Sequence, residues 1–226
     1  MTHAYSELYV SNAKLVLAHF FSRMIDDYKI DADIVTKIFS VTGYAEQFER
    51  GNPSVVAGMS GLELADRVLE TAYGGENPES YTEAAEESVV TYRAVITPAY
   101  WAGWALAEYQ WFTGRRFDEI FRQLPLSEIM LMYSPYHEMD VMTFVEDLEE
   151  RIQQAIAASD TRLKTIRERA GLSQSELAKA AGVHIRSIQM YEQRQNDIDK
   201  AQGQTLFKLS RALGCKIEDL LESPSL

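Results

Sequence analysis

The chain has 226 residues, which is long for a single small domain, so we expect two domains. Apolar residues make up 46% of it and charged residues 25%, a composition that excludes disordered, collagen-like and disulfide-scaffold proteins. The net charge of −12 would argue against nucleic acid as a partner if it were spread evenly along the chain.

The charge is not spread evenly. Residues 160–226 hold 11 Lys and Arg against 9 Asp and Glu, whereas residues 1–159 hold 11 against 25. Within residues 162–211 the balance is 10 basic against 5 acidic side chains. A mildly basic module is therefore attached to a strongly acidic one, and this asymmetry is itself a hint of function.

Three features bear on the compartment. No apolar run reaches the ~18 residues of a membrane span, and the N-terminus lacks the basic start and apolar run of a signal peptide. The single cysteine, Cys215, cannot form an internal disulfide, which fits a reducing cytosol. We expect a soluble cytoplasmic protein with no membrane contact.

Helical periodicity dominates the chain and no Asn-Gly or Asp-Gly hairpin signal is present, so an all-α fold is predicted. We expect an N-terminal helical bundle domain over residues 1–158 and a second domain over residues 160–226. Residues 74–87 hold two glycines, a proline and five glutamates, which predicts an exposed loop. Outside the second domain, helices are expected over Asn12–Tyr28, Ala32–Val41 with Asp31 as its cap, Tyr44–Arg50, Leu62–Tyr73, Pro98–Phe112, Arg116–Gln123, Ser127–Tyr133 and Met139–Ala158.

The helix at Pro98–Phe112 is the most aromatic segment. Apolar groups occupy nearly all its sides, which is typical of a helix in the core of a bundle, and its alanines and Gly103 would let neighbours approach closely. Trp101, Trp104 and Trp111 could instead form a box for a cofactor. Ordinary core packing is the favoured interpretation, and no cofactor is predicted.

The last helix of the first domain has apolar residues in steps of four and three. This short heptad-like seam suits either a dimer contact or packing on its own domain, and its short length favours the second. The junction between the domains is expected at residues 157–160. The seam consists of Val141, Val145, Leu148, Ile152 and Ala155.

Signals for catalysis are weak. Residues 137–141 begin like a zinc-peptidase motif but lack its second histidine, and the four histidines are scattered. No phosphate-binding Gly-rich loop and no Gly-x-Ser-x-Gly motif is present. We therefore predict no metal site, no catalytic residue and no enzyme.

Residues 162–222 contain short helices separated by turns. The first spans Arg162–Ala170, and the second begins at Ser173, where Glu176 three residues on completes a capping box. Gly182 closes it, since a sharp turn needs a residue that tolerates positive φ. The third helix is expected near His184–Gln193 and the fourth at 204–213.

The third helix leaves an unusual set of side chains facing outward. A solvent face usually avoids isoleucine and methionine, so this face is expected to contact a partner. A helix fits the DNA major groove, where side chains near its N-terminus reach base edges. The outward residues are His184, Ile185, Arg186, Gln189 and Met190.

At this point a family resemblance is evident. Residues 166–183, 186–192 and 206–214 resemble the XRE family, the Cro and phage-repressor type of DNA-binding domain, over about 60 residues. The resemblance implies a five-helix, lambda-repressor-like DNA-binding domain at 160–226. It also implies double-stranded DNA as partner and a homodimer as the usual arrangement.

The resemblance also implies roles for single residues. Ser173 and Gln174 match phosphate-contacting positions, and Gln174 also braces a side chain of the recognition helix. Ile185, Arg186 and Met190 match base-reading positions, with Arg186 suited to guanine and Ile185 to a thymine methyl. Arg167 and Glu192 match a structural ion pair between the first and third helices. Further candidate DNA contacts are His184, Ser187, Gln189 and Arg194.

The sequence departs from the family pattern after Glu192. The family usually has a glycine and a proline-containing loop there, whereas residues 193–200 contain neither. Arg194 and Lys200 are able to reach the DNA backbone, or they lie in a solvated loop. The path of this loop is not predicted.

The resemblance favours a sequence-specific transcriptional regulator, in particular a dimeric repressor. An alternative is an antitoxin that regulates its own operon while its acidic first domain covers a basic partner protein, the toxin. A small-molecule effector bound beside the aromatic helix is a third possibility. A catalytic domain delivered by the DNA-binding module is least favoured.

Overall fold

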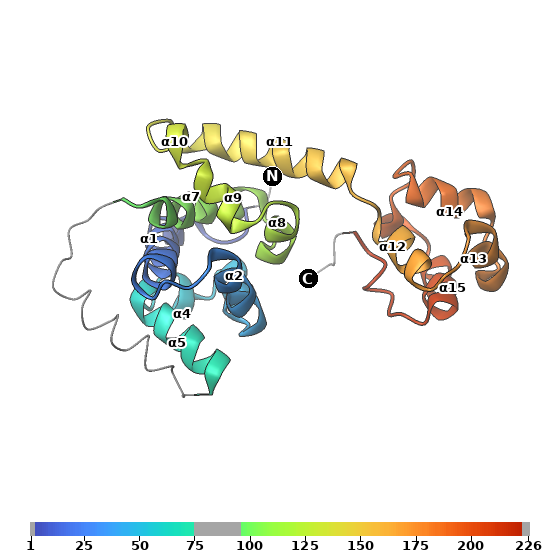
Figure 1. Cartoon of the computed structure of the whole chain (residues 1–226), viewed down its shortest axis with the longest axis horizontal. Coiled ribbons are helices and arrows are strands. Elements are labelled where there is room, and N and C mark those ends of the chain that lie inside the picture. The colour runs from blue at the N-terminus through green and yellow to red at the C-terminus, as the bar shows by residue number, and fades with distance from the viewer. Residues whose placement is uncertain (1–2, 75–95, 223–226) are drawn as a thin grey trace. The chain divides into compact units, whose positions relative to one another are not determined.

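The computed structural model describes residues 3–74 and 96–222 (Figure 1). The chain divides into two compact units, Met1–Ala155 and Ile156–Leu226. Every regular element in the described ranges is a helix and none is a strand, which confirms the predicted all-α class. Apart from Gly74, the loop expected at 74–87 lies outside the described residues.

Most helices of unit 1 match predicted elements, but those at Glu7–Tyr9 and Pro53–Val56 were not predicted, and the last helix continues past the boundary at Ala155. None of the described helices combines the length and apolarity that crossing a membrane requires. In chain order the elements are η1 (Glu7–Tyr9), α1 (Val10–Ser22), the π-helical turn η2 (Arg23–Asp27), α2 (Ala32–Val41), α3 (Tyr44–Glu49), α4 (Pro53–Val56), α5 (Gly61–Tyr73), α7 (Pro98–Thr113), α8 (Phe117–Gln123), α9 (Leu126–Leu131), α10 (Tyr133–Tyr136) and α11 (Val141–Ala158).

Local signals in the sequence account for several of these boundaries. The Asp31 carboxylate accepts the backbone N–H groups of Asp33 and Ile34 at 3.0 and 3.1 Å, so it caps α2 as predicted. Gly114 ends α7 with a φ of 68°. The helix expected at Ser127–Tyr133 is instead divided into α9 and α10, and Ser134 has a non-helical ψ of 121°.

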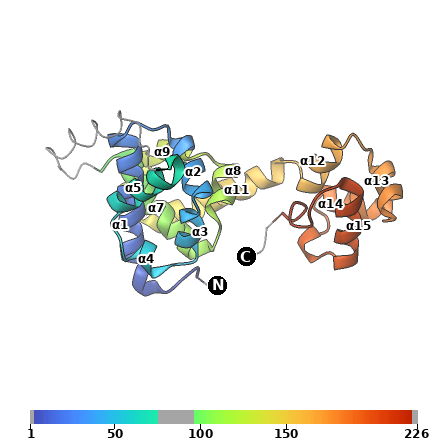
Figure 2. The same cartoon turned by 90° about the horizontal axis from the view of Figure 1, so that it is seen from below.

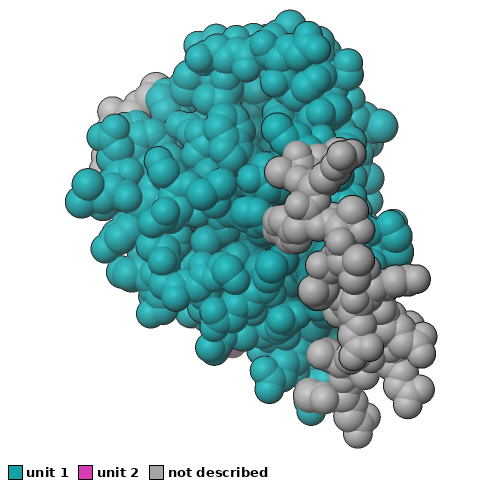
Figure 3. All heavy atoms as spheres, turned by 90° about the vertical axis from the view of Figure 1, so that its left-hand side faces the viewer, with its two compact units in different colours: residues 1–155 teal, residues 156–226 magenta. Residues whose placement is uncertain are grey.

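The core of unit 1 forms around α1 and α7, which lie side by side (Figure 1). A Cβ atom on Gly103 of α7 would collide with the backbone carbonyl of Leu17 in α1. The small residue is therefore required for the close approach predicted for this helix. Figure 3 shows one face of the surface of unit 1 in teal.

The seam on α11 packs within its own unit. Val145, Leu148 and Ile152 are buried, as is Phe144 beside them. The favoured interpretation of the heptad-like pattern therefore holds for the centre of the seam, while Val141 and Ala155 at its ends are half-buried.

Unit 2 contains the turn-and-helix arrangement expected from the sequence (Figure 2). Five helical segments surround one core, the fourth of them a 3-10 turn. Leu163, Leu177, Ile188 and Leu209 are fully buried at its centre. The segments are α12 (Arg162–Arg169), α13 (Gln174–Ala181), α14 (Ile185–Glu192), η3 (Ile198–Lys200) and α15 (Gly203–Leu213).

Candidate nucleic-acid interface

The turn between α13 and α14 is built as the sequence predicts. The Ser173 hydroxyl accepts the Glu176 backbone N–H at 3.2 Å, and the Glu176 carboxylate accepts the Ser173 backbone N–H at 2.8 Å. This capping box begins α13, and Gly182 ends it with a φ of 59°. The two helices are thereby held at a tight corner, with α14 starting at Ile185.

His184 begins α14 as its N-cap. Its Nδ1 atom lies 3.2 Å from the backbone N–H of Arg186 and accepts a hydrogen bond from it. A backbone N–H only donates, so Nδ1 carries no hydrogen in this arrangement. The exposed ring therefore has a structural role at the helix start, and its contact with DNA remains a prediction.

One face of α14 is open. Ile185 is 38% exposed and Arg186 is exposed, while Ser187, Gln189 and Met190 are half-buried. Ile188, on the opposite side, is fully buried in the core of unit 2. The helical repeat thus brings residues 185, 186, 189 and 190 together on one accessible surface.

Arg186 is the positive charge on this surface. Within the described ranges, its guanidinium makes no hydrogen bond or ion pair with another side chain. Five N–H donors in a planar fork are thus available for a planar acceptor pair such as the edge of guanine. The ion pairs that engage other arginines of unit 2 do not involve this one.

Three helices meet at the Glu192 carboxylate, at the end of α14. Arg167 of α12 donates from Nε to Oε1 at 2.6 Å and from Nη2 to Oε2 at 2.9 Å. Gln174 of α13 donates from Nε2 to Oε2 at 2.8 Å. The predicted ion pair is therefore present and buried, and the side chain that Gln174 braces is Glu192.

The two residues predicted to touch phosphate are already engaged in unit 2. The Ser173 hydroxyl donates to Glu176 at 2.6 Å. Hydrogen bonds from the Ser173 hydroxyl and backbone lower the pKa of Glu176, which favours an anion at the start of α13. A phosphate approaching Ser173 would meet that charge, and the phosphate contacts of Ser173 and Gln174 remain predictions.

Arg194 is set apart from the other predicted site residues. It has a φ of 53° and follows the end of α14, where Gln195 N donates to Met190 O and Arg194 N to Tyr191 O. This is a Schellman motif with arginine at the position usually taken by glycine. The glycine missing from the family pattern is thus replaced by a residue in the same left-handed conformation.

The Arg194 guanidinium is bound within unit 2. Nη1 donates to the Ser159 carbonyl at 2.6 Å, and Nη2 lies 3.4 Å from the Glu222 carboxylate. Neither Ser159 nor Glu222 was predicted as a partner of this side chain, since both lie far from it along the chain. Lys200, the other basic residue of the loop, pairs with Asp197 at 2.8 Å. The loop is therefore held by one ion pair within it and by the contacts of Arg194 with residues outside it.

The tryptophans of unit 1 do not form one box. Trp111 donates its indole N–H to the Tyr5 carbonyl at 2.8 Å, and Trp101 packs against Phe144 with ring centroids 5.0 Å apart. Trp104 is half-buried beneath the Lys14 ammonium. Core packing holds for Trp101, which is buried, whereas Trp111 is half-buried, and Trp101 and Trp104 also line a cavity. Among the described residues, no group of three or more His, Cys, Asp or Glu is placed to hold a metal ion.

Comparison with known proteins bears on unit 2. Residues 163–220 match a family model described as helix-turn-helix. No curated protein and no solved structure matches the chain. The match spans α12 to α15. It therefore includes the open face of α14 and the contacts of Arg167 and Gln174 with the Glu192 carboxylate.

Proposed function

We propose that the chain represses transcription as a dimer, with α14 in the major groove of its operator. The premise is that the chain is a DNA-binding transcription regulator through its XRE-type helix-turn-helix domain at residues 163–220. The observation that carries this proposal is the open face of α14, with Ile185 and Arg186 exposed on a helix fixed from behind by Glu192.

Base reading comes from the N-terminal half of α14. Arg186 donates two hydrogen bonds to O6 and N7 of a guanine, which no other base pair accepts in the same way. Ile185 packs on a thymine methyl group. Gln189 and Met190, one turn further on, contact the next bases or the sugars beside them.

The contacts behind α14 keep this face in place. Arg167, Gln174 and Glu192 join α12, α13 and α14 through one carboxylate, so the recognition helix is not free to rotate about its axis. A preorganised reading face loses less conformational entropy on binding, and its side chains meet the bases in one register.

The charge of the chain fits a weak, salt-sensitive contribution from phosphates. Residues 162–211 hold 10 basic against 5 acidic side chains, whereas residues 1–159 are strongly acidic. The acidic unit repels DNA, so we assign it a separate role as a sensor or partner-binding domain. A dimer then supplies two reading helices, one helical turn of DNA apart, to an inverted repeat.

Selection of duplexes from random DNA by the full-length chain tests the proposal. We expect enrichment of an inverted repeat, and gel shifts should show far weaker binding to one half-site than to the pair. If the selected pool carries no shared motif, sequence-specific reading by α14 is wrong. If a single half-site binds as tightly as the repeat, the dimer is wrong while DNA reading stands.

A further inference from the structure

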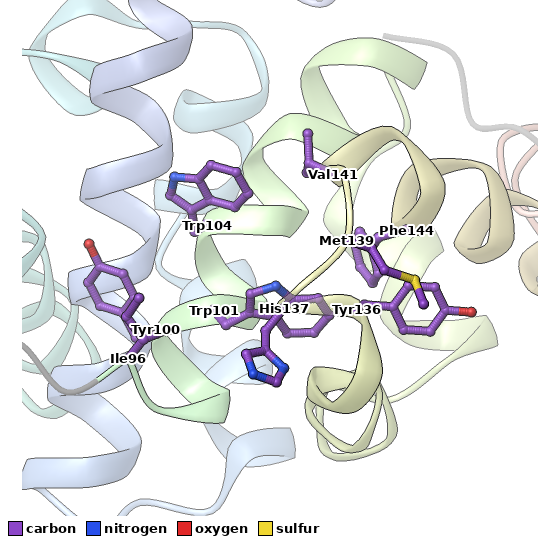
Figure 4. A pocket seen from close by; sticks show the side chains of 9 residues that line it. All are labelled: Ile96, Tyr100, Trp101, Trp104, Tyr136, His137, Met139, Val141 and Phe144. Carbon is purple, nitrogen blue, oxygen red and sulfur yellow. The ribbon is translucent and has the colours of Figure 1, made fainter.

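Unit 1 contains a cavity of about 320 Å³ beside the aromatic helix α7. Its walls come from α7, from the segment around α10 and from the start of α11, as Figure 4 shows. Pockets for small molecules usually have volumes of ~300–1,000 Å³ and mostly apolar walls. Aromatic side chains dominate here: Tyr100, Trp101, Trp104, Tyr136 and Phe144.

The walls are held by ring contacts that leave them little freedom. Trp101 meets Phe144 edge to face at 5.0 Å and Tyr133 at 5.9 Å between ring centroids. Tyr136 meets the same Phe144 at 6.0 Å. A ligand that enters this cavity therefore finds flat apolar surfaces already in place, which favours a flat molecule.

Two polar groups give the cavity a chemical signature. The indole N–H of Trp101 makes no hydrogen bond within the described ranges, and Trp101 and His137 both line the cavity (Figure 4). The His137 Nδ1 atom lies 2.8 Å from the Tyr133 carbonyl, which can only accept, so Nδ1 carries the hydrogen. In the neutral ring Nε2 is then an acceptor, which the Glu138 carboxylate 3.6 Å away leaves free because an ionised carboxylate has no hydrogen to donate.

The charge of the walls argues against an ionic ligand. Among the described residues, those that line the cavity include no Lys, Arg, Asp or Glu. A cation held by aromatic faces is disfavoured as well, because the Lys14 ammonium already lies 3.7 Å from the centre of the Trp104 ring. Lys14 is itself paired with Glu108, so a cationic ligand would have to displace an ion pair to reach this face of the ring.

We infer that this cavity binds a neutral, flat heteroaromatic molecule that presents an acceptor to the Trp101 indole N–H and a donor to His137 Nε2. The ligand stacks among the aromatic walls, and the two hydrogen bonds select it from plain hydrocarbons. This site lies wholly in unit 1, so ligand binding is measured without DNA. Failure of this inference is therefore distinguishable from failure of operator binding.

Calorimetric titration of the full-length chain tests the inference, with 2-quinolone as the probe. This neutral bicyclic compound carries a ring N–H donor beside a carbonyl acceptor. We expect saturable one-site binding, with N-methyl-2-quinolone about tenfold weaker because it lacks the donor. Three outcomes would each overturn the inference. They are no saturable binding of 2-quinolone up to millimolar concentration, equal affinity for the two quinolones, and tighter binding of choline than of 2-quinolone.

Variants locate the site. Trp101→Phe removes the donor and His137→Phe removes the acceptor while keeping a ring to stack on Tyr133, and each should weaken 2-quinolone about tenfold. His137→Phe should also abolish the difference between 2-quinolone and its N-methyl derivative. Trp111→Phe is the matched control, since its indole binds Tyr5 away from the cavity. Binding unchanged in His137→Phe, with the fold verified by circular dichroism, would place the ligand elsewhere and refute the site.

Discussion

Arg167 and Glu192 form a two-point ion pair that joins the first helix of unit 2 to the recognition helix, with N–O distances of 2.6 and 2.9 Å. Both side chains are nearly inaccessible, at 9% and 2% exposure. Gln174 donates to the same carboxylate. Since each charge is desolvated, removing one partner costs much more than removing both.

The first prediction follows from that asymmetry. Arg167→Met leaves the Glu192 carboxylate buried with only Gln174 as a donor, and we expect a loss of about 3 kcal/mol in the stability of unit 2. Glu192→Leu should cost less, because the Arg167 guanidinium keeps the Leu172 carbonyl at 2.7 Å and the Glu168 carboxylate at 3.3 Å. The double variant should be more stable than either single variant, since no buried charge remains without its partner.

The chain offers an internal reference for this measurement. All three tryptophans lie in unit 1, so denaturant unfolding followed by tryptophan fluorescence reports unit 1, whereas circular dichroism reports both units. The variants should shift the unfolding of unit 2, which dichroism detects. They should leave the unfolding of unit 1, which fluorescence detects, unchanged. Additive losses in the double variant would mean that the pair is not coupled.

The second prediction concerns Arg194 and its positive φ of 53°. Arg194→Ala loses the contacts to Ser159 and Glu222 and keeps the left-handed conformation, so unit 2 should lose about 1–2 kcal/mol. Arg194→Gly loses the same contacts but tolerates the conformation, and should be about 1 kcal/mol more stable than the alanine variant.

A phosphate contact by Arg194 would give another result. Both variants would then lower the slope of the logarithm of DNA affinity against the logarithm of salt concentration by about one. Because the guanidinium is bound within unit 2, we expect that slope to remain unchanged. A lowered slope with unaltered stability would return Arg194 to the set of DNA contacts.

The sequence predicts both units well where short-range chemistry decides the structure. The Asp31 cap, the Ser173–Glu176 capping box and the left-handed Gly182 each depend on residues two to four positions apart. The loop after Glu192 was not predicted, because the contacts of Arg194 come from residues 35 positions before it and 28 after it. Such long-range pairs leave no periodic signal.

The cavity illustrates a second limit of the sequence. An aromatic helix that is apolar on nearly all sides has the same pattern whether neighbouring side chains fill every gap or leave one open. Trp101 belongs to the core and to a cavity wall at once, with 6% of its surface exposed. Only the positions of Tyr136 and Phe144, from other elements, distinguish the two cases.

The third prediction concerns Glu149 on α11. Burial raises the pKa of its carboxyl, but hydrogen bonds from Arg115, Gln153 and Tyr109 outweigh burial and lower that pKa from 4.5 to about 2. Arg115 donates to both oxygens, at 2.8 and 2.7 Å. The carboxylate thereby ties α11 to the segment that follows α7.

The sign of the pH effect follows from the lowered value. Between pH 4.5 and 2 the unfolded chain takes up the proton that folded Glu149 resists, so stability is fully present above that window and lost as pH falls through it. Since the side chain is 33% exposed, solvent screening reduces the contribution to about 1–2 kcal/mol. Glu149→Gln should flatten this part of the stability profile of unit 1, measured by tryptophan fluorescence, whereas Glu150→Gln should leave it intact. A profile unchanged in Glu149→Gln would refute the role of this carboxylate.

The last prediction addresses base reading by α14. Arg186→Ala should lower affinity for the selected operator by about 1–3 kcal/mol and relax the preference for guanine at one position in each half-site. The reason is that a bidentate contact to guanine discriminates among bases, while a phosphate contact does not. Competition gel shifts with operators substituted at each position measure both effects at fixed salt.

Arg169→Ala is the matched control, because Arg169 is an exposed arginine at the end of α12 rather than on the open face of α14. It should leave the base preferences of the operator unchanged. A contrary result is that the Arg186→Ala variant loses the same affinity for operator and random DNA and keeps the guanine preference of the parent chain. That result would mean that Arg186 contacts the DNA backbone and does not read a base. Ile185→Ala then separates two possibilities. If it too alters no base preference, the reading face does not lie on α14. If it weakens only the preference for thymine, α14 still reads the operator without its arginine.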